Sequence, residues 1–320
     1  MKSMLEDGFA RAFAPTGDGF REALIAGLAQ SPKKIPCKYF YDAVGARLFD
    51  EICTLPEYYL TRTENVLLRA HAAEISALAG SDVEIMEFGA GSGDKIRILL
   101  DGFHHPRAYM PVDFSVTWLD RLAERLRKDY PALQVHPVIG DFTGSLQWPL
   151  ASQARRLGFF PGSTIGNFTP REAREFLSAA AAILNGGALL IGVDLFKDPA
   201  ILHAAYNDRA GITAAFNLNL LSRANRDAGA DFDPARFFHY AFYNAVEGRI
   251  EMYLISTISQ KARVSGRSFA FSQGEAILTE YSYKYTVEGF QELATSAGLI
   301  PRKFWCDPDG LFSLHWLESR

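Results

Sequence analysis

The stretch that decides the fold, Val83–Lys95, reads VEIMEFGAGSGDK. Residues 83–88 form a short apolar run that contains two acids, which is typical of a buried parallel strand. Three glycines then occupy alternate positions from Gly89, and a helical pattern begins at Asp94. Glycine has no Cβ, so the backbone can turn sharply and approach a ligand closely, while the first turn of a helix presents free N–H groups. The stretch therefore predicts a nucleotide-binding turn.

The glycine spacing separates two classes of nucleotide site. Gly89, Gly91 and Gly93 give the pattern G-x-G-x-G, whereas a dinucleotide fingerprint requires its third glycine at position 94, which is Asp94. The compressed spacing, with Glu87 just before the loop, resembles the first motif of class I S-adenosylmethionine-dependent methyltransferases. Their cofactor is a sulfonium cation with an amino acid tail, so carboxylates near the loop suit it better than a phosphate cradle does.

Acids at the ends of two later strands support a nucleoside ligand. Asp113 lies 20 residues after Gly93, at the end of a second predicted strand, where a carboxylate can accept both ribose hydroxyls. Asp141 and Phe142 follow a third predicted strand, where they would hold the adenine edge and face. Acids at strand ends also cap helices, and for either acid alone this alternative carries about equal weight. The strand, the glycine loop and both acids in this order favour the nucleoside site.

Composition limits the class of protein. The chain has 320 residues, of which 48% are hydrophobic, enough for one large domain or for a domain with a substantial insertion. Its net charge of −4 offers no basic surface for nucleic acid. The three cysteines, Cys37, Cys53 and Cys306, form no metal-binding pattern and cannot make a complete disulfide set. We therefore expect a reducing, cytoplasmic location, no bound metal and no nucleic acid partner.

The chain also lacks the patterns of export and membrane insertion. Its N-terminus carries acids and has no apolar core of signal-peptide length. The longest apolar runs, such as 188–193, are far too short to cross a bilayer. We expect a protein that has no membrane partner and acts as a monomer.

Strand and helix patterns alternate after the deciding stretch. We expect strands at 83–88, 109–112, 133–139, 156–160 and 187–193, and helices at 94–104, 115–129 and 170–184. This rhythm predicts a doubly wound parallel sheet, in which ligands bind at the carboxyl ends of the strands. The segment 161–167, PGSTIGN, would project from the same edge as the glycine loop.

The remaining segments complete the core and predict a second subdomain. We expect helices at 20–29, 43–53, 62–78, 198–207, 211–227 and 287–297, and strands at 237–243, 249–260, 265–272, 276–285, 302–306 and 311–316. Thr61 and Glu64 form the pattern of a capping box, which sets the start of the third helix. The prediction is an α/β fold: a core of 61–195 and 287–320, and an α+β substrate-binding subdomain of 1–60 and 196–286.

Six segments together resemble the L-histidine Nα-methyltransferase family of ergothioneine biosynthesis. They are KYFYDAVGARLFDEICTLPEYYLTRTE (38–64), EFGAGSGDK (87–95), PGSTIGNFTP (161–170), AAYNDRAGITAAFNLNLL (204–221), RIEMYL (249–254) and LTEYSYKY (278–285). The match extends over nearly the whole chain and includes the insertion, where substrate choice should reside. It is therefore much more specific than the glycine loop alone, and it implies a class I methyltransferase fold.

The resemblance implies two sets of site residues. The positions implied for S-adenosylmethionine are Gly89, Gly91, Lys95, Asp113, Asp141 and Phe142. The positions implied for histidine are Tyr41, Tyr58, Gly162, Asn167, Tyr206, Met252, Glu280 and Ser282. Of these, we expect Tyr41 and Asn167 to take part in catalysis.

The implied residue types suit a free histidine. Asn167 and Tyr206 are donors for its carboxylate, and Glu280 with Ser282 can satisfy both imidazole nitrogens. The latter pair stands at i and i+2, so that on a strand both side chains share one face. Taken singly, Glu280 reads as an exposed strand acid, Met252 as a core residue and Asn167 as a turn residue. The match across separate segments outweighs these ordinary interpretations.

The activity implied is three successive methyl transfers to the α-amine of L-histidine, through its mono- and dimethyl forms, to give hercynine. The nucleophile is the neutral amine, and we expect Tyr41 to orient or deprotonate it. Aromatic faces of Tyr41, Tyr58 or Phe168 would hold the quaternary product.

Three alternatives stay open at this point. The nearest is an N-methyltransferase of another aromatic amino acid or small amine. A dinucleotide-dependent oxidoreductase is the second, and the glycine spacing argues against it. The third is a protein that binds the cofactor without turnover.

Overall fold

The computed structural model describes residues 19–114, 116–142, 144, 147–150 and 152–320. Within them the chain divides into two compact units: unit 1 comprises 60–195 and 285–320, and unit 2 comprises 19–59 and 196–284. The boundaries expected from the sequence are 60/61, 195/196 and 286/287. The expected membership of residues 1–18 in the second subdomain lies outside the described residues.

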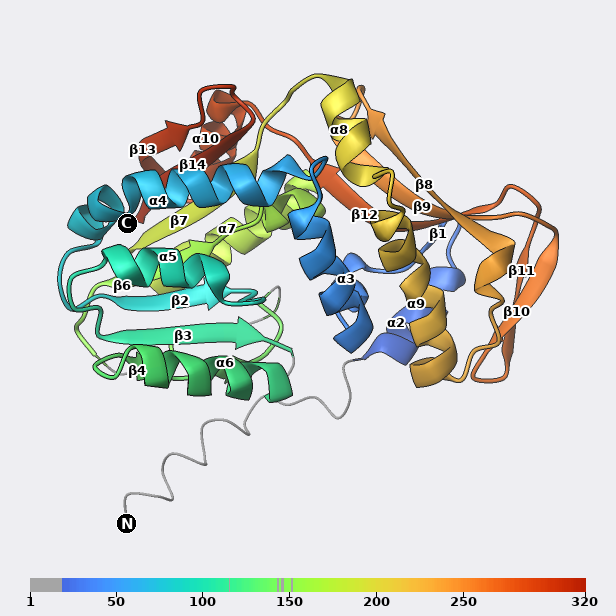
Figure 1. Cartoon of the computed structure of the whole chain (residues 1–320), viewed down its shortest axis with the longest axis horizontal. Helices are drawn as coiled ribbons and strands as arrows, with labels where there is room; N and C mark the ends of the chain where they lie inside the picture. Colours follow the sequence, from blue (N-terminus) through green and yellow to red (C-terminus); the bar gives the residue numbers. More distant parts are fainter. Residues whose placement is uncertain (1–18, 115, 143, 145–146, 151) are drawn as a thin grey trace, which may run out of the picture. The chain divides into compact units, whose positions relative to one another are not determined.

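Unit 1 is built on a mixed sheet (Figure 1). In its described part the sheet has eight strands in the order β13-β14-β7-β6-β2-β3-β4, and β5 also pairs with β3. The strands are β2 (Glu84–Phe88), β3 (Ala108–Asp113), β4 (Gln134–Val135), β5 (Val138–Ile139), β6 (Arg156–Phe160), β7 (Ala188–Asp194), β13 (Leu299–Cys306) and β14 (Phe312–Ser319). From β4 to β7 neighbouring strands are parallel, while β14 is antiparallel to both its neighbours. The predicted doubly wound α/β sheet is confirmed, and the antiparallel pair β13 and β14 closes it at one edge.

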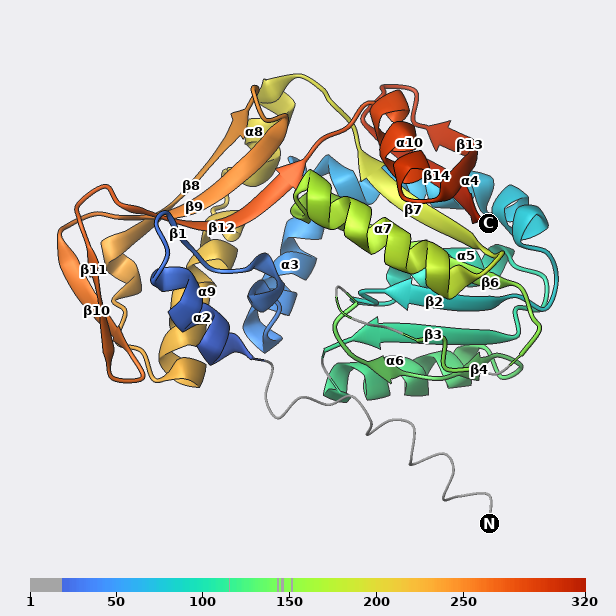
Figure 2. The ribbon, with the colours of Figure 1, turned by 180° about the vertical axis from the view of Figure 1, so that it is seen from behind.

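Helices cover both faces of this sheet (Figures 1 and 2). They are α4 (Tyr59–Ala79), α5 (Asp94–Gly102), α6 (Val116–Asp129), α7 (Pro170–Leu184) and α10 (Val287–Ser296). Successive residues of β2 enter different cores, as the alternation of a strand requires. Ile85 packs with residues of α4, α5 and α6, whereas Met86 and Phe88 pack with residues of α7 and α10. Both faces of β2 are therefore buried, which explains its continuous apolar run.

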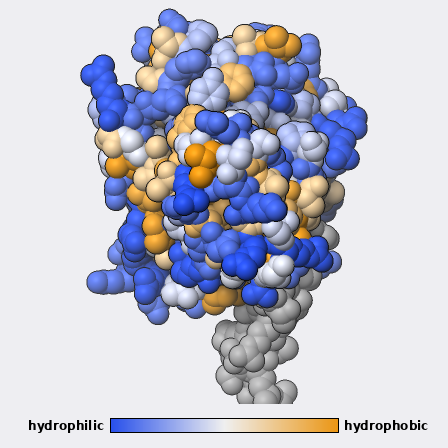
Figure 3. Space-filling view, turned by 90° about the vertical axis from the view of Figure 1, so that its right-hand side faces the viewer, coloured by the Kyte–Doolittle hydropathy of each residue, from blue (hydrophilic) through white to orange (hydrophobic). Residues whose placement is uncertain are grey.

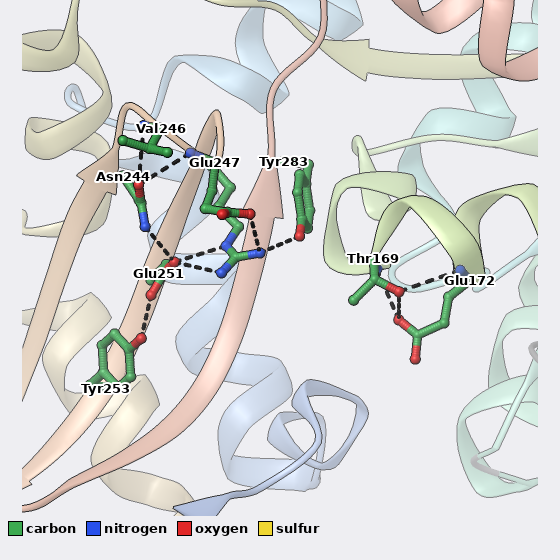
Figure 4. A network of polar contacts seen from close by, with 9 residues as sticks. Thr169, Glu172, Asn244, Val246, Glu247, Glu251, Tyr253 and Tyr283 are labelled. Carbon is green, nitrogen blue, oxygen red and sulfur yellow. Dashed lines mark hydrogen bonds and ion pairs between the residues drawn. The ribbon is translucent and has the colours of Figure 1, made fainter. Parts of the chain in front are cut away.

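Two predicted elements of unit 1 differ from the structure. The expected strand 133–139 is two short strands, because Pro137 between them has no N–H for a ladder bond. The expected capping box of Thr61 and Glu64 is wrong: the helix begins at Tyr59, Thr61 lies inside it, and Glu64 is fully buried. A capping box does form between Thr169 and Glu172, at the start of α7 (Figure 4).

Unit 2 contains a four-stranded sheet in the order β1-β12-β9-β8 and a hairpin of β10 and β11. Its elements are α2 (Phe20–Leu28), β1 (Lys33–Lys34), η1 (Cys37–Phe40), α3 (Ala43–Thr54), α8 (Pro199–Tyr206), α9 (Ile212–Ala228), η3 (Pro234–Arg236), β8 (Phe237–Asn244), β9 (Arg249–Ser256), β10 (Gln260–Val264), β11 (Arg267–Phe271) and β12 (Ala276–Tyr283). The expected single strand 249–260 is wrong, since the chain leaves β9 at Ser256 and enters β10 at Gln260.

The N-terminal segment and the insertion are joined within unit 2 by backbone and side-chain bonds. β1 pairs in parallel with β12, with Lys33 opposite Ile277. The amide of Asn219 donates to Asp42 at 2.8 Å, and the guanidinium of Arg223 donates to the carbonyl of Tyr39 at 2.7 Å. These bonds fix α3 and η1 against α9.

One face of the unit 2 sheet carries a polar network (Figure 4). The guanidinium of Arg249 contacts the carboxylates of Glu251 and Glu247 and the hydroxyl of Tyr283, and Tyr253 and Asn244 donate to Glu251. The surface is that of an ordinary globular protein on the molecular face shown in Figure 3, where hydrophobic residues lie singly or in small groups among hydrophilic ones.

Among the described residues, none of the helices has the length and apolar character that a bilayer span requires.

Candidate active site

The glycine loop between β2 and α5 is tied to the end of β3. The N–H groups of Gly89 and Ala90 both donate to the carbonyl of Val112, at 3.0 and 3.2 Å. Gly89 has φ 80°, in the left-handed region that favours glycine. A Cβ there would stand 3.3 Å from the ring of Phe142. The indole N–H of Trp118, from α6, donates to the carbonyl of Gly91. The loop therefore has one defined course that a side chain at Gly89 would disturb.

The structure brings the two predicted acids to the same edge of the sheet. Asp113 is the last residue of β3 and pairs in register with Ile139 of β5. The N–H of Gly140 donates to the Asp113 carbonyl at 3.1 Å, so Asp141 and Phe142 follow directly beside the end of β3. Because β2 and β3 are neighbours, the glycine loop, both acids and Phe142 lie at adjoining strand ends.

Glu87, the acid before the loop, is buried and accepts a hydrogen bond from the hydroxyl of Tyr109. Burial raises the pKa of Glu87 to about 8, against the lowering effects of the Tyr109 bond and of the Lys95 ammonium. Glu87 is therefore largely a neutral acid at neutral pH.

Lys95 and Gly162 meet at a buried carboxylate that the sequence analysis missed. The ammonium of Lys95 lies 2.5 Å from Glu64 Oε2, and the N–H of Gly162 donates to both oxygens of Glu64 at 2.9 and 3.0 Å. Gly162 has φ 79°, and a Cβ on it would stand 3.2 Å from the Lys95 nitrogen. A signal was available, because Glu64 stands four residues after Leu60 and four before Leu68, on the buried stripe of α4.

The loop after β6 carries both predicted histidine positions of unit 1. Gly162 begins it, and Asn167, half-buried, ends the short helix η2 (Thr164–Asn167). The hydroxyl of Ser163 accepts a bond from the N–H of Asp194 at 2.9 Å, which anchors the loop to β7. Phe168 stacks on Phe160 with ring centroids 6.3 Å apart. The loop is therefore fixed at both ends.

In unit 2, a β-bulge sets the direction of Glu280. The register between β12 and β9 shifts between Leu278 and Glu280, so that Thr279 is an extra residue. After the shift Glu280 stands opposite Met252, and Ser282 opposite Ile250. Alternation keeps Glu280 and Ser282 on one face of β12, and the bulge makes this the face opposite to the Arg249 network.

Ser282 is the centre of a hydrogen-bonded group in which one member was not predicted. The phenol of Tyr206 donates to Ser282 Oγ at 2.8 Å, and the ammonium of Lys284 donates to the same oxygen at 2.7 Å. All three side chains are buried, Lys284 to 2% exposure. A lysine in a strand pattern ordinarily indicates an exposed position, so the sequence carried no direct signal for Lys284.

A histidine side chain binds the backbone carbonyl of Tyr206. His239 Nε2 lies 2.9 Å from the Tyr206 carbonyl, and the Asn217 amide donates to His239 Nδ1 at 2.9 Å. The carbonyl can only accept, so Nε2 carries the proton, and burial lowers the pKa of His239, which keeps the ring neutral. Asn217 is itself fully buried. These hydrogen bonds hold the C-terminal end of α8 in one position.

The two predicted tyrosines of the N-terminal segment lie around shared aromatic rings. Tyr41 and Tyr58 both pack edge-on against Phe49, at centroid distances of 5.4 and 6.2 Å. Tyr58 is buried. Its pKa is raised well above 10, mainly by burial and to a smaller extent by the neighbouring Tyr206 phenol. Tyr41 is 46% exposed, so a ligand can reach its ring. Glu280 acts electrostatically on both phenols.

Within the residues that the structure describes, no cluster of three or more histidine, cysteine, aspartate or glutamate side chains is arranged to hold a metal ion. The absence of a metal from the reaction stays a prediction.

Comparison with known proteins gives a consistent result. The model of the family described as "Histidine-specific methyltransferase, SAM-dependent" matches residues 20–319. A "Histidine N-alpha-methyltransferase" of Mycolicibacterium smegmatis is 43% identical over 93% of this chain and 94% of its own. The protein of the same name from Mycobacterium tuberculosis is 40% identical over 92% and 93%. An "Ergothioneine biosynthesis protein 1" of Neurospora crassa is 30% identical over 86% of this chain and 32% of its own.

Proposed function

This chain belongs to the family of histidine-specific, S-adenosylmethionine-dependent methyltransferases, and we propose that it trimethylates the α-amino group of L-histidine to hercynine, the first step of ergothioneine biosynthesis. The observation that carries the proposal is the extent of the family match, which includes the insertion with Glu280 and Ser282. Proteins that share only the nucleotide-binding turn would match over a shorter range.

The residues of unit 1 fit the methyl donor. S-adenosylmethionine, when bound, supplies a methyl group on a positively charged sulfur. The glycine loop would accommodate its amino acid tail, Asp113 would accept the ribose hydroxyls, and Asp141 with Phe142 would hold the adenine. The fit rests on carboxylates at adjoining strand ends and on a loop where a Cβ at Gly89 would crowd Phe142. Lys95 would act beside this site through its ion pair with Glu64.

The residues of unit 2 fit the imidazole of histidine. The Glu280 carboxylate would accept one ring N–H, and Ser282 would satisfy the other ring nitrogen. Met252 stands opposite Glu280 across the two strands and would contact the ring. Burial raises the pKa of Glu280 to about 7, and Lys284 opposes this rise, so the carboxylate is ionised in an appreciable fraction of molecules at neutral pH.

The remaining groups would bind the carboxylate of the substrate and its amine as that amine is methylated. Asn167 would donate to the carboxylate. The sequence analysis expected Tyr206 to do the same, but its single phenol proton is donated to Ser282 Oγ at 2.8 Å, so Tyr206 would act through Ser282. Tyr41 would orient the amine rather than deprotonate it, because burial and then the Glu280 charge raise the pKa of its phenol well above 10, so the phenol stays protonated at neutral pH. The aromatic faces of Tyr41 and Tyr58 would hold the amine as it becomes a quaternary cation.

The stoichiometry of the reaction tests the proposal. Purified protein is incubated with L-histidine and excess S-adenosylmethionine, and S-adenosylhomocysteine is counted per histidine consumed. We expect three, with hercynine as the final product. A ratio of one at completion, or no consumption of histidine, would contradict it.

A further inference from the structure

We propose that Lys284 and Tyr206 orient the hydroxyl of Ser282 so that its proton points towards the substrate ring, and that the protein thereby selects a ring with one donor nitrogen and one acceptor nitrogen. Lys284 is then a positioning residue that determines specificity. The inference rests on the proposed function and adds to it a cause for the choice of imidazole.

The backbone places three side chains on one face. Glu280, Ser282 and Lys284 follow at alternate positions after the bulge, so all three point to the same side of β12. The N–H of Lys284 donates to the Gly248 carbonyl at 2.9 Å, which continues the strand pairing by one residue. The direction of Lys284 is therefore set by the strand and not by a flexible loop.

Valence then determines the direction of the Ser282 proton. A hydroxyl has two acceptor lone pairs and one proton, and a lysine ammonium can only donate. Ser282 Oγ accepts from Lys284 at 2.7 Å and from the Tyr206 phenol at 2.8 Å. With both lone pairs engaged, the hydroxyl presents its proton to a third group. Ser282 is therefore a donor to the ligand and not an acceptor.

The positioning role of Lys284 accounts for the burial of its ammonium group. Removing an ammonium from water is costly, whereas methionine or leucine would fill a similar volume without that cost. At Lys284 the charge is compensated by the Ser282 bond, by the Glu280 carboxylate and by the Tyr206 ring, whose centroid lies 5.1 Å from the nitrogen. Each of these partners belongs to the proposed histidine site.

A donor at Ser282 and an acceptor at Glu280 fit neutral imidazole in one tautomer. The ring N–H would face Glu280, and the unprotonated nitrogen would face Ser282. An indole or a pyrrole has an N–H but no acceptor nitrogen, so its binding would leave the Ser282 proton unpaired. Sites with buried polar groups discriminate strongly against ligands that leave those groups unpaired.

Binding of two ring analogues tests this assignment. Dissociation constants are measured by calorimetry for L-histidine and for L-3-(pyrrol-3-yl)alanine, which keeps a ring N–H and lacks the acceptor nitrogen. For the unchanged protein we expect histidine to bind at least tenfold more tightly. In Lys284→Met the Ser282 hydroxyl can turn its proton back to Tyr206, and we expect the ratio to fall about tenfold. An unchanged ratio in a folded Lys284→Met protein would overturn the proposal.

Two further measurements keep the outcome decisive. Tyr206→Phe removes the second bond to Ser282 while Lys284 remains, and it should also reduce the ratio; if Lys284→Met does not fold, this variant decides. Equal losses of affinity for both ligands would indicate a purely structural role for Lys284 and contradict the proposal. Turnover of histidine by the unchanged protein is measured in parallel. If the unchanged protein binds histidine more tightly than the pyrrole analogue but does not methylate it, the proposed function is wrong and the role of Lys284 stands. If it does not bind histidine, both proposals are wrong.

Discussion

Both carboxylate oxygens of Glu64 accept the backbone N–H of Gly162, at 2.9 and 3.0 Å, although 98 residues separate the two positions. The bond joins helix α4 to the loop that carries Gly162 and Asn167. Lys95, in the first turn of α5, neutralises the same carboxylate at 2.5 Å. A single buried acid therefore connects the start of α5 with the loop after β6 at the predicted ligand edge of unit 1.

Replacement of this acid should be costly. In Glu64→Ala the Gly162 N–H loses its acceptor and Lys95 its counter-ion, and we expect the free energy of unfolding to fall by about 3 kcal/mol. The matched control is Glu74→Ala on the same helix, whose carboxylate also binds a lysine, Lys303, but is 40% exposed; it should cost less than about 1 kcal/mol. Urea unfolding of both variants measures the difference. Equal costs would show that the Gly162 bond contributes little.

Gly89→Ala should weaken binding of S-adenosylmethionine at least tenfold. The change imposes strain at φ 80° and brings a Cβ to 3.3 Å from the Phe142 ring, inside the predicted adenine position. Gly80→Ala is the control, because Gly80 has φ 81° but a Cβ there meets nothing within 4 Å. Both variants carry similar backbone strain, so calorimetric titration with the cofactor isolates the effect of the loop. Equal affinities in the two variants would argue against the assigned cofactor site.

Glu280→Ala should weaken histidine binding at least tenfold and cofactor binding less than twofold, because a buried imidazole N–H loses its acceptor. Glu275→Ala serves as control, since that acid lies just before β12 and pairs with Lys33 near the surface. Titration with each ligand separately gives the two ratios. A parallel loss of both affinities would mean that Glu280 supports the fold.

Acid stability should depend on His315. The ring is buried with its Nε2 2.9 Å from Ser313 Oγ, and burial lowers its pKa to about 3. The unfolded chain, with an ordinary imidazole pKa near 6.5, binds the extra proton. Stability is therefore lost as the pH falls from about 6.5 towards 3, by about 1.4 kcal/mol per pH unit from this group. His315→Phe should flatten that part of the profile in urea unfolding series; an unchanged slope would exclude His315 as its source.

The arrangement of the proposed cofactor residues in unit 1 was predictable from residue types, because strand, glycine loop and acids occupy fixed places in a doubly wound sheet. The positions of Asp113 and Asp141 beside the glycine loop follow from that topology alone. The ends of the strands were not predictable in the same way. The hydrophobic pattern predicts one continuous strand at 133–139, which Pro137 divides into two.

The proposed substrate positions in unit 2 were suggested by family resemblance and not by hydrophobic or glycine patterns. Alternation puts Glu280 and Ser282 on one face but does not say which, since the bulge at Thr279 decides that and leaves no mark in the sequence. Lys284 was missed because charged residues are normally exposed, and only the tertiary structure shows the partners that compensate its burial. The burial of Glu64 was indicated by its spacing from Leu60 and Leu68, but its partners Lys95 and Gly162 are visible only in the tertiary structure.

The most direct test of the central claim is mass spectrometry of a mixture of the common amino acids incubated with the purified protein and S-adenosylmethionine. Competition in one vessel compares all acceptors under the same conditions. We expect histidine to become heavier by three methyl groups while the other amino acids stay unchanged. Methylation of another amino acid in preference to histidine would contradict the assignment of Glu280 and Ser282, and no methylated amino acid at all would contradict the proposed function.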